Sequence, residues 1–241
     1  MAEIMKVCVL GRHGLIGGAL EKKLITSGHV VSSYPTKETK LLFHFGSTVH
    51  PPFEENPDYH IQEILSSFMY LLPFCRDNGI RFVYPSSALV YEKNTVFAKC
   101  KKIMELYASC YPDTLGVRIF PVYGPGEHRT AISQWCEAMK RGERPVIYGD
   151  GTQERDFIYI DDVVDQITDL VNYEITGIRD VGAGKPVSFN SIVATINKVL
   201  GTDLKPIYKE APKGYSKGIV CERPGVIKVS MEEGIRKILN V

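Results

Sequence analysis

The sequence predicts an α/β fold with a doubly wound parallel sheet and helices on both of its faces. Short apolar runs alternate along the chain with longer segments of helical periodicity, as residues 5–10, 58–79, 80–87 and 97–111 show. This alternation is typical of parallel strands joined by crossover helices. The chain of 241 residues is 44% hydrophobic and 24% charged, which indicates a globular protein with a sizeable core.

The elements follow one another regularly as far as residue 120, and less regularly after it. Apolar runs predict strands, whereas glycine, asparagine and proline mark the turns between elements. The expected strands are 5–10, 29–34, 40–47, 80–87, the start of 115–126, and 178–184. The expected helices are the later part of 11–28, then 58–79, 97–111, 130–142, 161–173, 188–201 and 230–239.

The segment "GRHGLIG" places Gly11, Gly14 and Gly17 between the first strand and the first helix. Glycine permits a tight turn there and lets the helix amino terminus approach a pyrophosphate. A purely structural turn is the alternative, but the strand, turn and helix context favours dinucleotide binding on a Rossmann-like sheet.

The identity of the dinucleotide is not fixed by the second strand. That strand ends in "VVSSYP", without the Asp or Glu that would bond a ribose 2′-hydroxyl. Arg12, Lys37 and Lys40 would suit a 2′-phosphate, although lysines after a strand are usually solvated. We expect NAD, with NADP as an open alternative.

Charge and cysteine usage exclude several classes of function. The formal net charge is +1 and neither sign dominates a long run, so we expect neither nucleic acid nor a membrane surface as partner. No apolar run approaches the ~20 residues of a spanning helix, and no signal-peptide pattern opens the chain, which favours the cytoplasm. We expect no metal site, because the cysteines are scattered without metal-ligand spacing: Cys8, Cys75, Cys100, Cys110, Cys136 and Cys221.

A set of segments resembles the extended short-chain dehydrogenase/reductase family, in particular its nucleotide-sugar epimerases and dehydratases. Besides the glycine turn, the segments are "LLFHFGS", "RFVYPSSALVY", "AKCKKIMELY", "VRIFPVYGPGE", "VIYGDGTQERDFIYIDDVV", "DVGAGKPVSF" and "ERPGV". The resemblance runs from about residue 5 to the end of the chain, and together these segments are far more specific than any one of them.

The resemblance implies an active site with a serine or threonine, a tyrosine and a lysine four residues after the tyrosine. Ser87 matches the hydroxyl residue, and Lys101 matches the lysine that holds the nicotinamide ribose. Phe97 occupies the tyrosine position. Phenylalanine has no ionisable oxygen, yet hydride transfer from a sugar carbon requires a base for the hydroxyl proton.

Three explanations of Phe97 are open: an engineered variant without the base, a natural enzyme that uses another group, or a protein that binds without turnover. Candidate substitute bases are Tyr91, Cys100 and a water held by Ser87. Each candidate also has a structural explanation, since Tyr91 belongs to a packing motif and Cys100 fits a helix interior.

Other departures from the family pattern bear on the sheet and on the substrate. The stretch between residues 34 and 40 is too short for the usual helix, strand and helix, so we expect one strand fewer. The loop from Tyr91 to Phe97 is also short. Pro121 replaces the usual asparagine and Val226 the usual acidic residue, which puts two substrate contacts in doubt.

The resemblance also implies which residues bind the two ligands. Arg155 and Arg223 match arginines that clamp a nucleotide diphosphate, a role suited to a planar fork of donors. The expected substrate contacts are Ser87, Tyr123, Val146, Tyr148, Arg155 and Arg223. The expected cofactor contacts are Gly11, Arg12, Gly14, Leu15, Ile16, Gly17, Ser47, Lys101 and Val122.

These contacts imply a division of the chain into two parts. We expect residues 1–120 to form the dinucleotide-binding core, with 156–184 returning to its sheet. Residues 121–155 and 185–241 are expected to form a small carboxyl-terminal lobe for a nucleotide-diphosphate sugar. The helices at 58–79 and 97–111 would form the dimer interface usual in the family.

The expected reaction is that of a nucleotide-sugar 4-epimerase that recycles its nicotinamide cofactor. Ala88 and Leu89 stand where the dehydratases carry an Asp-Glu pair, which weighs against a dehydratase. An NADPH-dependent 4-ketosugar reductase is an alternative, distinguished by net consumption of the cofactor. A non-catalytic dinucleotide sensor or scaffold is the alternative from another class of protein.

Overall fold

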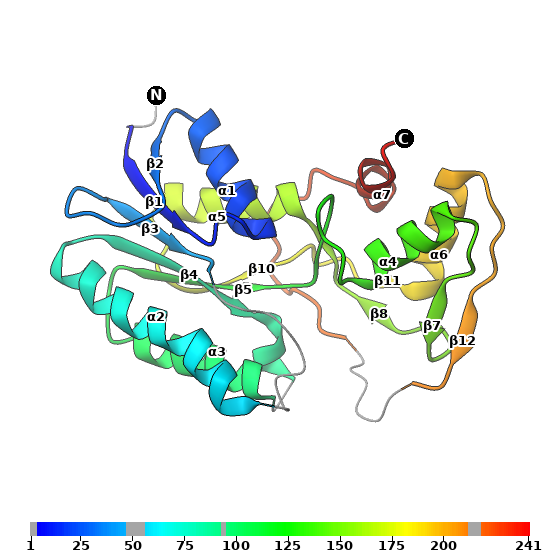
Figure 1. Cartoon of the computed structure of the whole chain (residues 1–241), viewed down its shortest axis with the longest axis horizontal. Coiled ribbons are helices and arrows are strands. Elements are labelled where there is room, and N and C mark those ends of the chain that lie inside the picture. Colours follow the sequence, from blue (N-terminus) through cyan, green and yellow to red (C-terminus); the bar gives the residue numbers. More distant parts are fainter. Residues whose placement is uncertain (1–3, 47–55, 93–94, 212–217) are drawn as a thin grey trace. The chain divides into compact units, whose positions relative to one another are not determined.

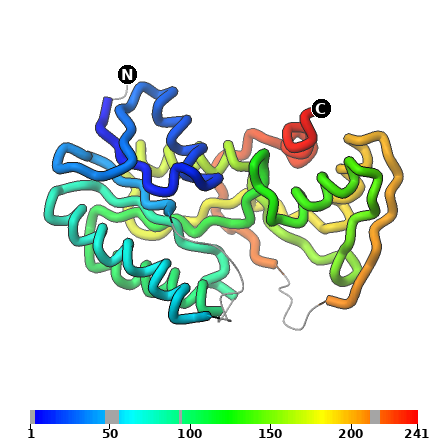
Figure 2. Tube along the Cα trace, in the orientation of Figure 1, coloured from blue at the N-terminus to red at the C-terminus, as the bar shows by residue number. Residues whose placement is uncertain are grey.

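The computed structural model describes residues 4–46, 56–92, 95–211 and 218–241, and the chain divides into two compact units. Unit 1 comprises Met1–Ile119 and Ile167–Asp180, and unit 2 comprises Phe120–Gln166 and Val181–Val241. The chain therefore leaves unit 1, returns to it once and leaves it again, as the tube in Figure 2 shows.

A six-stranded sheet in the order β10-β5-β4-β3-β1-β2 forms the centre of unit 1. Its strands are β1 (Lys6–Leu10), β2 (Val30–Ser32), β3 (Leu41–His44), β4 (Arg81–Ser87), β5 (Thr114–Ile119) and β10 (Gly177–Val181). Parallel pairing joins β1 to both β2 and β3, β3 to β4, and β4 to β5. The predicted doubly wound parallel sheet is confirmed.

Helices cover both faces of this sheet, and its inner strands are accordingly mostly apolar. The helices are α1 (Leu15–Thr26), α2 (Pro57–Asp77), α3 (Val96–Ala108) and α5 (Ile160–Asn172). Figure 1 shows α2 and α3 side by side on one face, with α1 on the other. All four residues of β3 are buried, and Phe68 of α2 packs against Phe82 and Tyr84 of β4.

Local sequence signals set where the helices of unit 1 begin. The Asn56 side chain caps α2 by accepting a hydrogen bond from the Tyr59 amide, and Pro57 occupies the first turn. The Thr95 side chain caps α3 in the same way. The Thr95 cap sets the start of α3 at Val96 and thereby determines which residues of α3 lie on its buried face.

The connection from β2 to β3 is short, as the sequence predicts. β2 ends at Ser32 and β3 begins at Leu41, and both strands pair with β1, one on each side. Among the described residues β2 is one edge of the sheet and β10 is the other. The described sheet has six strands.

Unit 2 is built from helices and very short strands. The elements are β6 (Val122–Tyr123), α4 (Ala131–Lys140), β7 (Val146–Tyr148), β8 (Glu154–Arg155), β9 (Ile158–Tyr159), β11 (Val187–Ser188), α6 (Phe189–Leu200), β12 (Ile207–Lys209) and α7 (Met231–Leu239). β11 pairs with β8, β12 with β7, and β6 with β9. The sequence does not predict these pairings, because strands of two or three residues show no hydrophobic period.

A buried carboxylate holds the segments of unit 2 together. Asp156 is fully buried, and its two oxygens accept hydrogen bonds from the amides of Ala183, Gly184 and Cys221, at 3.2, 3.0 and 2.8 Å. Buried charge is tolerated where several donors satisfy it. Asp156 therefore fixes the backbone that follows Arg155 against two other loops.

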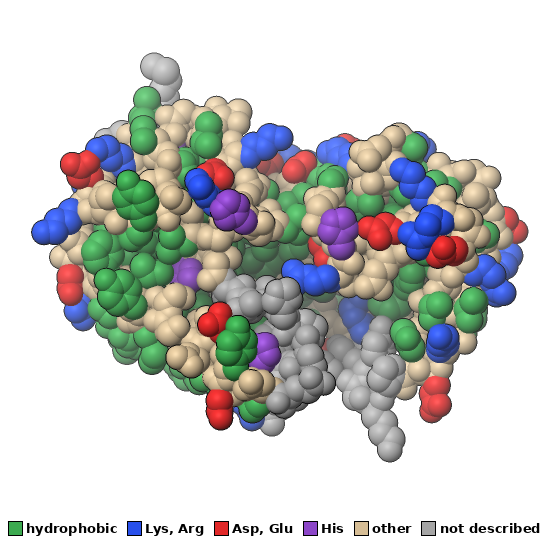
Figure 3. All heavy atoms as spheres, in the orientation of Figure 1, with side chains coloured by type: hydrophobic (Ala, Val, Ile, Leu, Met, Phe, Trp, Pro, Cys, Tyr) green, Lys and Arg blue, Asp and Glu red, His purple; other side chains and the backbone are tan. Residues whose placement is uncertain are grey.

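Neither a membrane-spanning helix nor a metal-binding cluster is found in the part of the chain that the structure describes. No described helix is long and apolar enough to cross a bilayer. No group of three His, Cys, Asp or Glu side chains within the same ranges is arranged to hold a metal ion. Basic and acidic side chains are interspersed on the face that Figure 3 shows.

Candidate functional site

The glycine turn between β1 and α1 is shaped by close backbone contacts. Gly11 adopts a φ of +82°, and a Cβ there would overlap the backbone of Phe45 and Gly46. A Cβ at Gly17 would overlap the carbonyl oxygen of Gly11. Gly14 is less constrained, since a Cβ there would lie 3.3 Å from that same oxygen. Two of the three glycines are therefore required by packing.

The first turn of α1 is open to an anionic ligand. Gly14 is the N-cap residue, so no side chain caps the helix, and no acidic residue lies in its first turn. Leu15 and Ile16 begin the helix, and Arg12 pairs with Glu21 at 3.4 Å. Unsatisfied amides with a favourable dipole are what a pyrophosphate requires, so this turn fits a dinucleotide.

Two predicted cofactor contacts lie elsewhere. Ser47 falls outside the described residues, and Val122 begins β6 in unit 2. At the end of β2 the Ser32 hydroxyl donates to the carbonyl oxygen of Tyr34, at 2.9 Å. Glu38, further along this connection, forms an exposed ion pair with Lys6.

Ser87 is the last residue of β4 and opens a single turn of 3₁₀ helix, η1 (Ala88–Tyr91). Its side-chain oxygen accepts a hydrogen bond from the Leu89 amide at 3.2 Å. This bond fixes the hydroxyl at the carboxyl end of the strand, the edge where ligands bind in such sheets.

A part-buried ion pair between Glu105 and Arg118 ties α3 to the sheet beside Ser87. Arg118 of β5 donates twice to the Glu105 carboxylate, at 2.8 and 2.7 Å, and the neighbouring Ser86 donates to the same carboxylate at 2.5 Å. The side chains of Glu105 and Arg118 are 11% and 23% exposed. A bidentate pair with so little solvent holds its elements in one geometry.

The remaining guanidinium nitrogen of Arg118 binds Tyr91, the residue that the sequence suggested as a substitute base. Arg118 donates to the Tyr91 hydroxyl at 2.7 Å, and that hydroxyl donates to the Asp180 carboxylate at 2.9 Å. Burial raises the pKa of Tyr91, although the bond from Arg118 acts in the opposite direction. The Tyr91 hydroxyl accepts one of these hydrogen bonds and donates the other, so its contacts favour a role for Tyr91 in fixing the position of η1.

Phe97 and Lys101 lie together on the buried face of α3, one turn apart. Phe97 is 9% exposed and Lys101 is 2% exposed. The Lys101 amine lies over the Phe97 ring, 5.3 Å from its centre. Its hydrogen-bond partner is the Met104 thioether sulfur, at 3.8 Å, and no carboxylate among the described residues pairs with it.

The surroundings of this amine shift several ionisation equilibria. Burial lowers the pKa of Lys101 to about 8. Burial and the Lys101 charge lower the pKa of His44, at the end of β3, to about 4, so His44 is neutral. Burial raises the pKa of the Cys100 thiol, which is 1% exposed. His44 bonds Ser67 of α2 through Nε2 at 2.9 Å, and its Nδ1 has no described partner.

The residues predicted for the nucleotide sugar lie in unit 2. Arg155 of β8 is half-buried, donates to its neighbour's carbonyl oxygen at 2.7 Å and lies 5.6 Å from the centre of the Phe189 ring. Arg223 is exposed, and no hydrogen bond or ion pair joins it to another described residue. Val146 and Tyr148 are the ends of β7, and the Tyr148 side chain is exposed.

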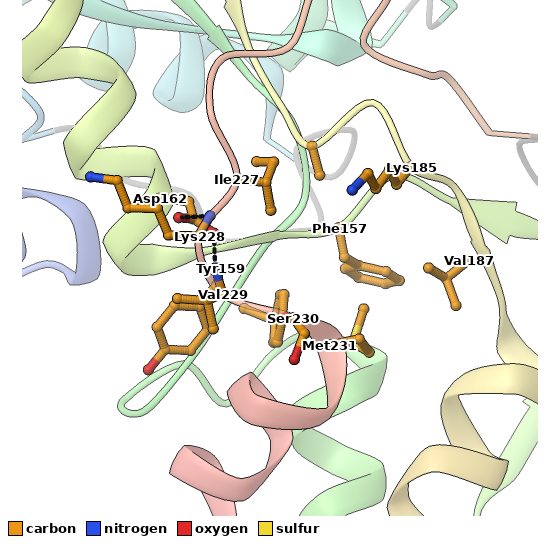
Figure 4. Close-up of a pocket in the computed structure, with 12 residues that line it drawn as sticks. Phe157, Tyr159, Asp162, Lys185, Val187, Ile227, Lys228, Val229, Ser230 and Met231 are labelled. Atoms are coloured by element: carbon orange, nitrogen blue, oxygen red, sulfur yellow. Dashed lines mark hydrogen bonds between the residues drawn. The ribbon is translucent and has the colours of Figure 1, made fainter.

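A cavity of about 340 Å³ within unit 2 contains one of these predicted residues, Tyr123. Its walls are mostly apolar, and Figure 4 shows Phe157, Val187 and Met231 around a common space with the Lys185 amine directed toward it. Asp162 is already satisfied by the amides of Lys228 and Val229, at 2.9 and 3.2 Å. The cavity suits a largely apolar group with an anionic end.

Four of the predicted substrate contacts do not line this cavity: Arg155, Arg223, Val146 and Tyr148. Sequence reasoning missed Phe157 and Lys185, which do. Their positions next to "QERD" and "VGAG" were the available signal, since residues beside a recognised motif share its loop. It also missed Glu105 and Arg118, whose signal was an acid on the buried face of a helix and a base inside a strand.

Comparison with known proteins shows the family. The sequence model of the NAD dependent epimerase/dehydratase family matches residues 34–175, more than half of the chain. The chain therefore belongs to this family of enzymes, and its cofactor is NAD. The matched segment includes Ser87, Phe97 and Lys101.

Similar proteins come from bacteria and archaea. Protein CapI of Staphylococcus aureus is 27% identical over 87% of this chain and 88% of its own length. A UDP-glucuronate 4-epimerase of Thermodesulfobacterium geofontis (strain OPF15) is 29% identical over 77% of this chain and 67% of its own. The alignment with CapI runs over 293 residues, more than the 241 of this chain, so CapI carries segments that have no counterpart here.

Solved structures share the fold. A UDP-N-acetylglucosamine 4-epimerase of Methanobrevibacter ruminantium M1 superposes with a TM-score of 0.88, at 22% identity, over 99% of this chain and 98% of that one. The UDP-glucose 4-epimerase of Thermotoga maritima gives a TM-score of 0.85, at 22% identity, over 98% of both chains. The predicted α/β fold is confirmed by these likenesses.

The glycine turn yields a first prediction. Gly17→Ala places a methyl group against the Gly11 carbonyl, so we expect loss of NAD binding with a stability loss of about 1 to 3 kcal/mol. Gly14→Ala is the matched control, since its φ of −85° suits alanine and its contact is longer, and it should retain NAD binding. Calorimetric titration with NAD and chemical denaturation measure both, and equal NAD affinity in the two variants would contradict the packing argument.

The buried amine yields a second prediction. Lys101→Met removes an amine whose pKa falls from 10.5 to about 8 on folding, so the free energy of unfolding at pH 7 should rise by roughly 3 kcal/mol. Between pH 8 and 10.5 the unfolded chain binds more protons than the folded one, so the unaltered protein gains stability. The difference in free energy of unfolding between Lys101→Met and the unaltered protein therefore decreases. Denaturant unfolding at pH 7 and pH 10 measures this, with the exposed Lys102→Met as control. A destabilised Lys101→Met would show that the amine is well solvated or paired.

Proposed function

We propose that this chain is a nucleotide-sugar 4-epimerase-type enzyme that binds NAD and a nucleotide-diphosphate sugar, with proton transfer slowed by Phe97. The observation that carries the proposal is the placement of Phe97 and Lys101 on one buried face of α3, beside the turn that presents Ser87. UDP-sugar 4-epimerases among the relatives and structural neighbours support the substrate class.

The residues of unit 1 fit the cofactor. Gly11 and Gly17 leave a cradle that a Cβ would fill, and the first turn of α1 supplies free amides for the pyrophosphate. The unpaired Lys101 amine suits the nicotinamide ribose hydroxyls, which would replace the weak thioether contact. When bound, NAD supplies a reversible hydride acceptor for the sugar carbon.

The chain's own residues then position the sugar hydroxyl. Ser87 would hydrogen-bond the reacting hydroxyl from its fixed place at the end of β4. In this proposal the proton of that hydroxyl must leave as the hydride leaves, and the Phe97 ring cannot accept it. Binding is therefore expected to be ordinary and turnover slow.

Unit 2 would bind the nucleotide end of the substrate. Arg155 and Arg223 are suited to the diphosphate, because the planar guanidinium pairs with phosphate oxygens in a bidentate manner. Val146 and Tyr148 are the two end residues of β7, and in this proposal β7 lies along the nucleotide base. Pro121 and Val226 stand where the family carries two residues expected to contact the substrate, so the sugar and the nucleotide base are to be identified by assay.

Replacement of Phe97 tests the proposed function. Phe97→Tyr adds one oxygen at a 9% exposed position, so we expect turnover of the true substrate to rise by about 10² to 10⁴-fold. The measurement is epimerisation of a panel of UDP-, dTDP- and GDP-sugars followed by product separation. Phe97→Leu is the matched control, because it also lacks the oxygen and should not gain activity. Unchanged turnover of a true substrate in Phe97→Tyr would contradict the missing-base explanation.

The same panel separates the alternative functions. A 4-ketosugar reductase would consume NADPH stoichiometrically, whereas an epimerase leaves its cofactor unchanged after each turnover. A sensor or scaffold would bind the dinucleotide and show no affinity for any nucleotide sugar by calorimetry. The exposed Arg223, without an ion pair among the described residues, favours a ligand at the second site.

We also propose a homodimer formed through α2 and α3. Hydrophobic side chains gather on the surface over α2 in Figure 3. The exposed apolar residues of the two helices are Tyr59, Ile61, Met69, Tyr70, Ile103 and Leu106, with exposures from 39% to 74%. Two such helices from each copy would bury one another as a four-helix interface.

Disruption of this surface gives a further prediction. Leu106→Glu places a charge on a side chain that is 71% exposed in one copy, so it should shift the mass measured by light scattering from dimer to monomer. Tyr173→Glu is the control, because Tyr173 is 77% exposed but lies outside α2 and α3. If the unaltered protein is monomeric at all concentrations, the proposed interface is wrong.

A further inference from the structure

The Lys101 amine has fewer satisfying contacts than a buried ammonium requires. It is 2% exposed, it contacts a thioether sulfur at 3.8 Å and a ring face at 5.3 Å, and no described carboxylate neutralises it. An unpaired charge in such a place is costly, and the group can avoid the cost by releasing its proton. Lys101 can thus exist as a neutral amine with a free lone pair.

The other ionisable groups around this face are unsuited to take up a proton from a substrate. The Tyr91 hydroxyl is held between Arg118 and Asp180, and burial raises its pKa. The Cys100 thiol is buried, and its pKa is raised as well. The pKa of His44 is lowered to about 4, so it is a weak base. Of these groups Lys101 alone is shifted toward the neutral range, to about 8.

We propose that Lys101 itself accepts the proton of the sugar hydroxyl in this chain, directly or through one water, in place of the tyrosine oxygen that Phe97 lacks. The inference rests on the proposed function. The positions support it, since Phe97 and Lys101 are separated by one helical turn and the amine lies over the ring. The amine is thus adjacent to the place where the family's base would stand.

The step balances without a further reactant. The O–H bond of the substrate breaks and its proton forms an N–H bond at Nζ, as the C–H and O–H bonds are replaced by a C=O bond. Bound NAD would take up the hydride from the carbon and supply it again, and the proton on Nζ would then return to the oxygen to restore the alcohol. A lysine that must be neutral to react makes the first step faster as pH rises.

The ionisation of Lys101 can be measured without turnover. In protein labelled with ¹³C at the lysine ε-carbon, the Lys101 resonance is assigned by its absence in Lys101→Met. We expect its titration midpoint to lie near pH 8, at least one pH unit below those of exposed Lys99 and Lys102. A Lys101 midpoint that coincides with the exposed lysines would overturn the inference.

The kinetic test follows the reduction of bound NAD in a single turnover with a substrate identified on Phe97→Tyr. In the unaltered protein the rate should rise about tenfold per pH unit up to pH 8 and then level off. Lys101→Arg keeps a cation for the cofactor ribose but cannot release a proton, so its rate should be at least about tenfold lower at pH 9. Lys102→Met, on the exposed side of the helix, should retain the unaltered pH profile.

The outcomes separate this inference from the proposed function. If Phe97→Tyr reduces NAD with a nucleotide sugar while the unaltered protein shows no pH-dependent rate, the role of Lys101 is wrong and the proposed function stands. The same conclusion follows if Lys101→Arg binds NAD and retains the profile of the unaltered protein. If no variant reduces NAD with any nucleotide sugar, the proposed function itself fails, and the inference with it.

Discussion

The Arg118 guanidinium is the group on which the geometry of the candidate site in unit 1 depends. It joins β5 to α3 through Glu105 and to η1 through Tyr91, and Glu105 in turn holds Ser86 of β4. These bonds tie together the two segments that carry the site residues, namely the end of β4 with Ser87 and the helix α3 with Phe97 and Lys101. Because removal of one member of a buried pair leaves an unpaired charge, the arrangement is cooperative. The site is therefore held by a polar network rather than by packing alone.

The polar groups in this small region differ in how completely their hydrogen-bonding capacity is satisfied. Glu105 and Arg118 are paired almost completely, whereas Lys101, one turn earlier on α3, contacts only a sulfur and a ring among the described residues. A fold selected for stability alone would favour an apolar side chain at that position. The contrast supports the proposed role of the Lys101 amine in binding a ligand or in the reaction.

The sequence predicts the framework of this protein better than its details. Strand and helix periodicity locate the strands of the six-stranded sheet, and the short connection from residue 33 to 40 is already visible in the sequence. The spacing of Phe97 and Lys101 places them on one helical face, as the structure has them. The partnership of Glu105 with Arg118 depends on how α3 packs on β5, which no local pattern encodes. The cavity around Phe157 likewise depends on loops that Asp156 holds together.

In the proposed function, phenylalanine at position 97 has consequences beyond proton transfer. In the family's arrangement a tyrosine hydroxyl would be a polar neighbour for the lysine, and in its absence the Lys101 amine faces an apolar ring. A phenylalanine in the place of the family's tyrosine would therefore lower the polarity around the adjacent amine, which favours the neutral form of that amine. A cation–π contact to phenylalanine offsets part of this effect but supplies no proton acceptor. Phe97 would thus increase the fraction of Lys101 that is neutral and able to accept a proton near neutral pH, although the lower pKa makes the amine an intrinsically weaker base.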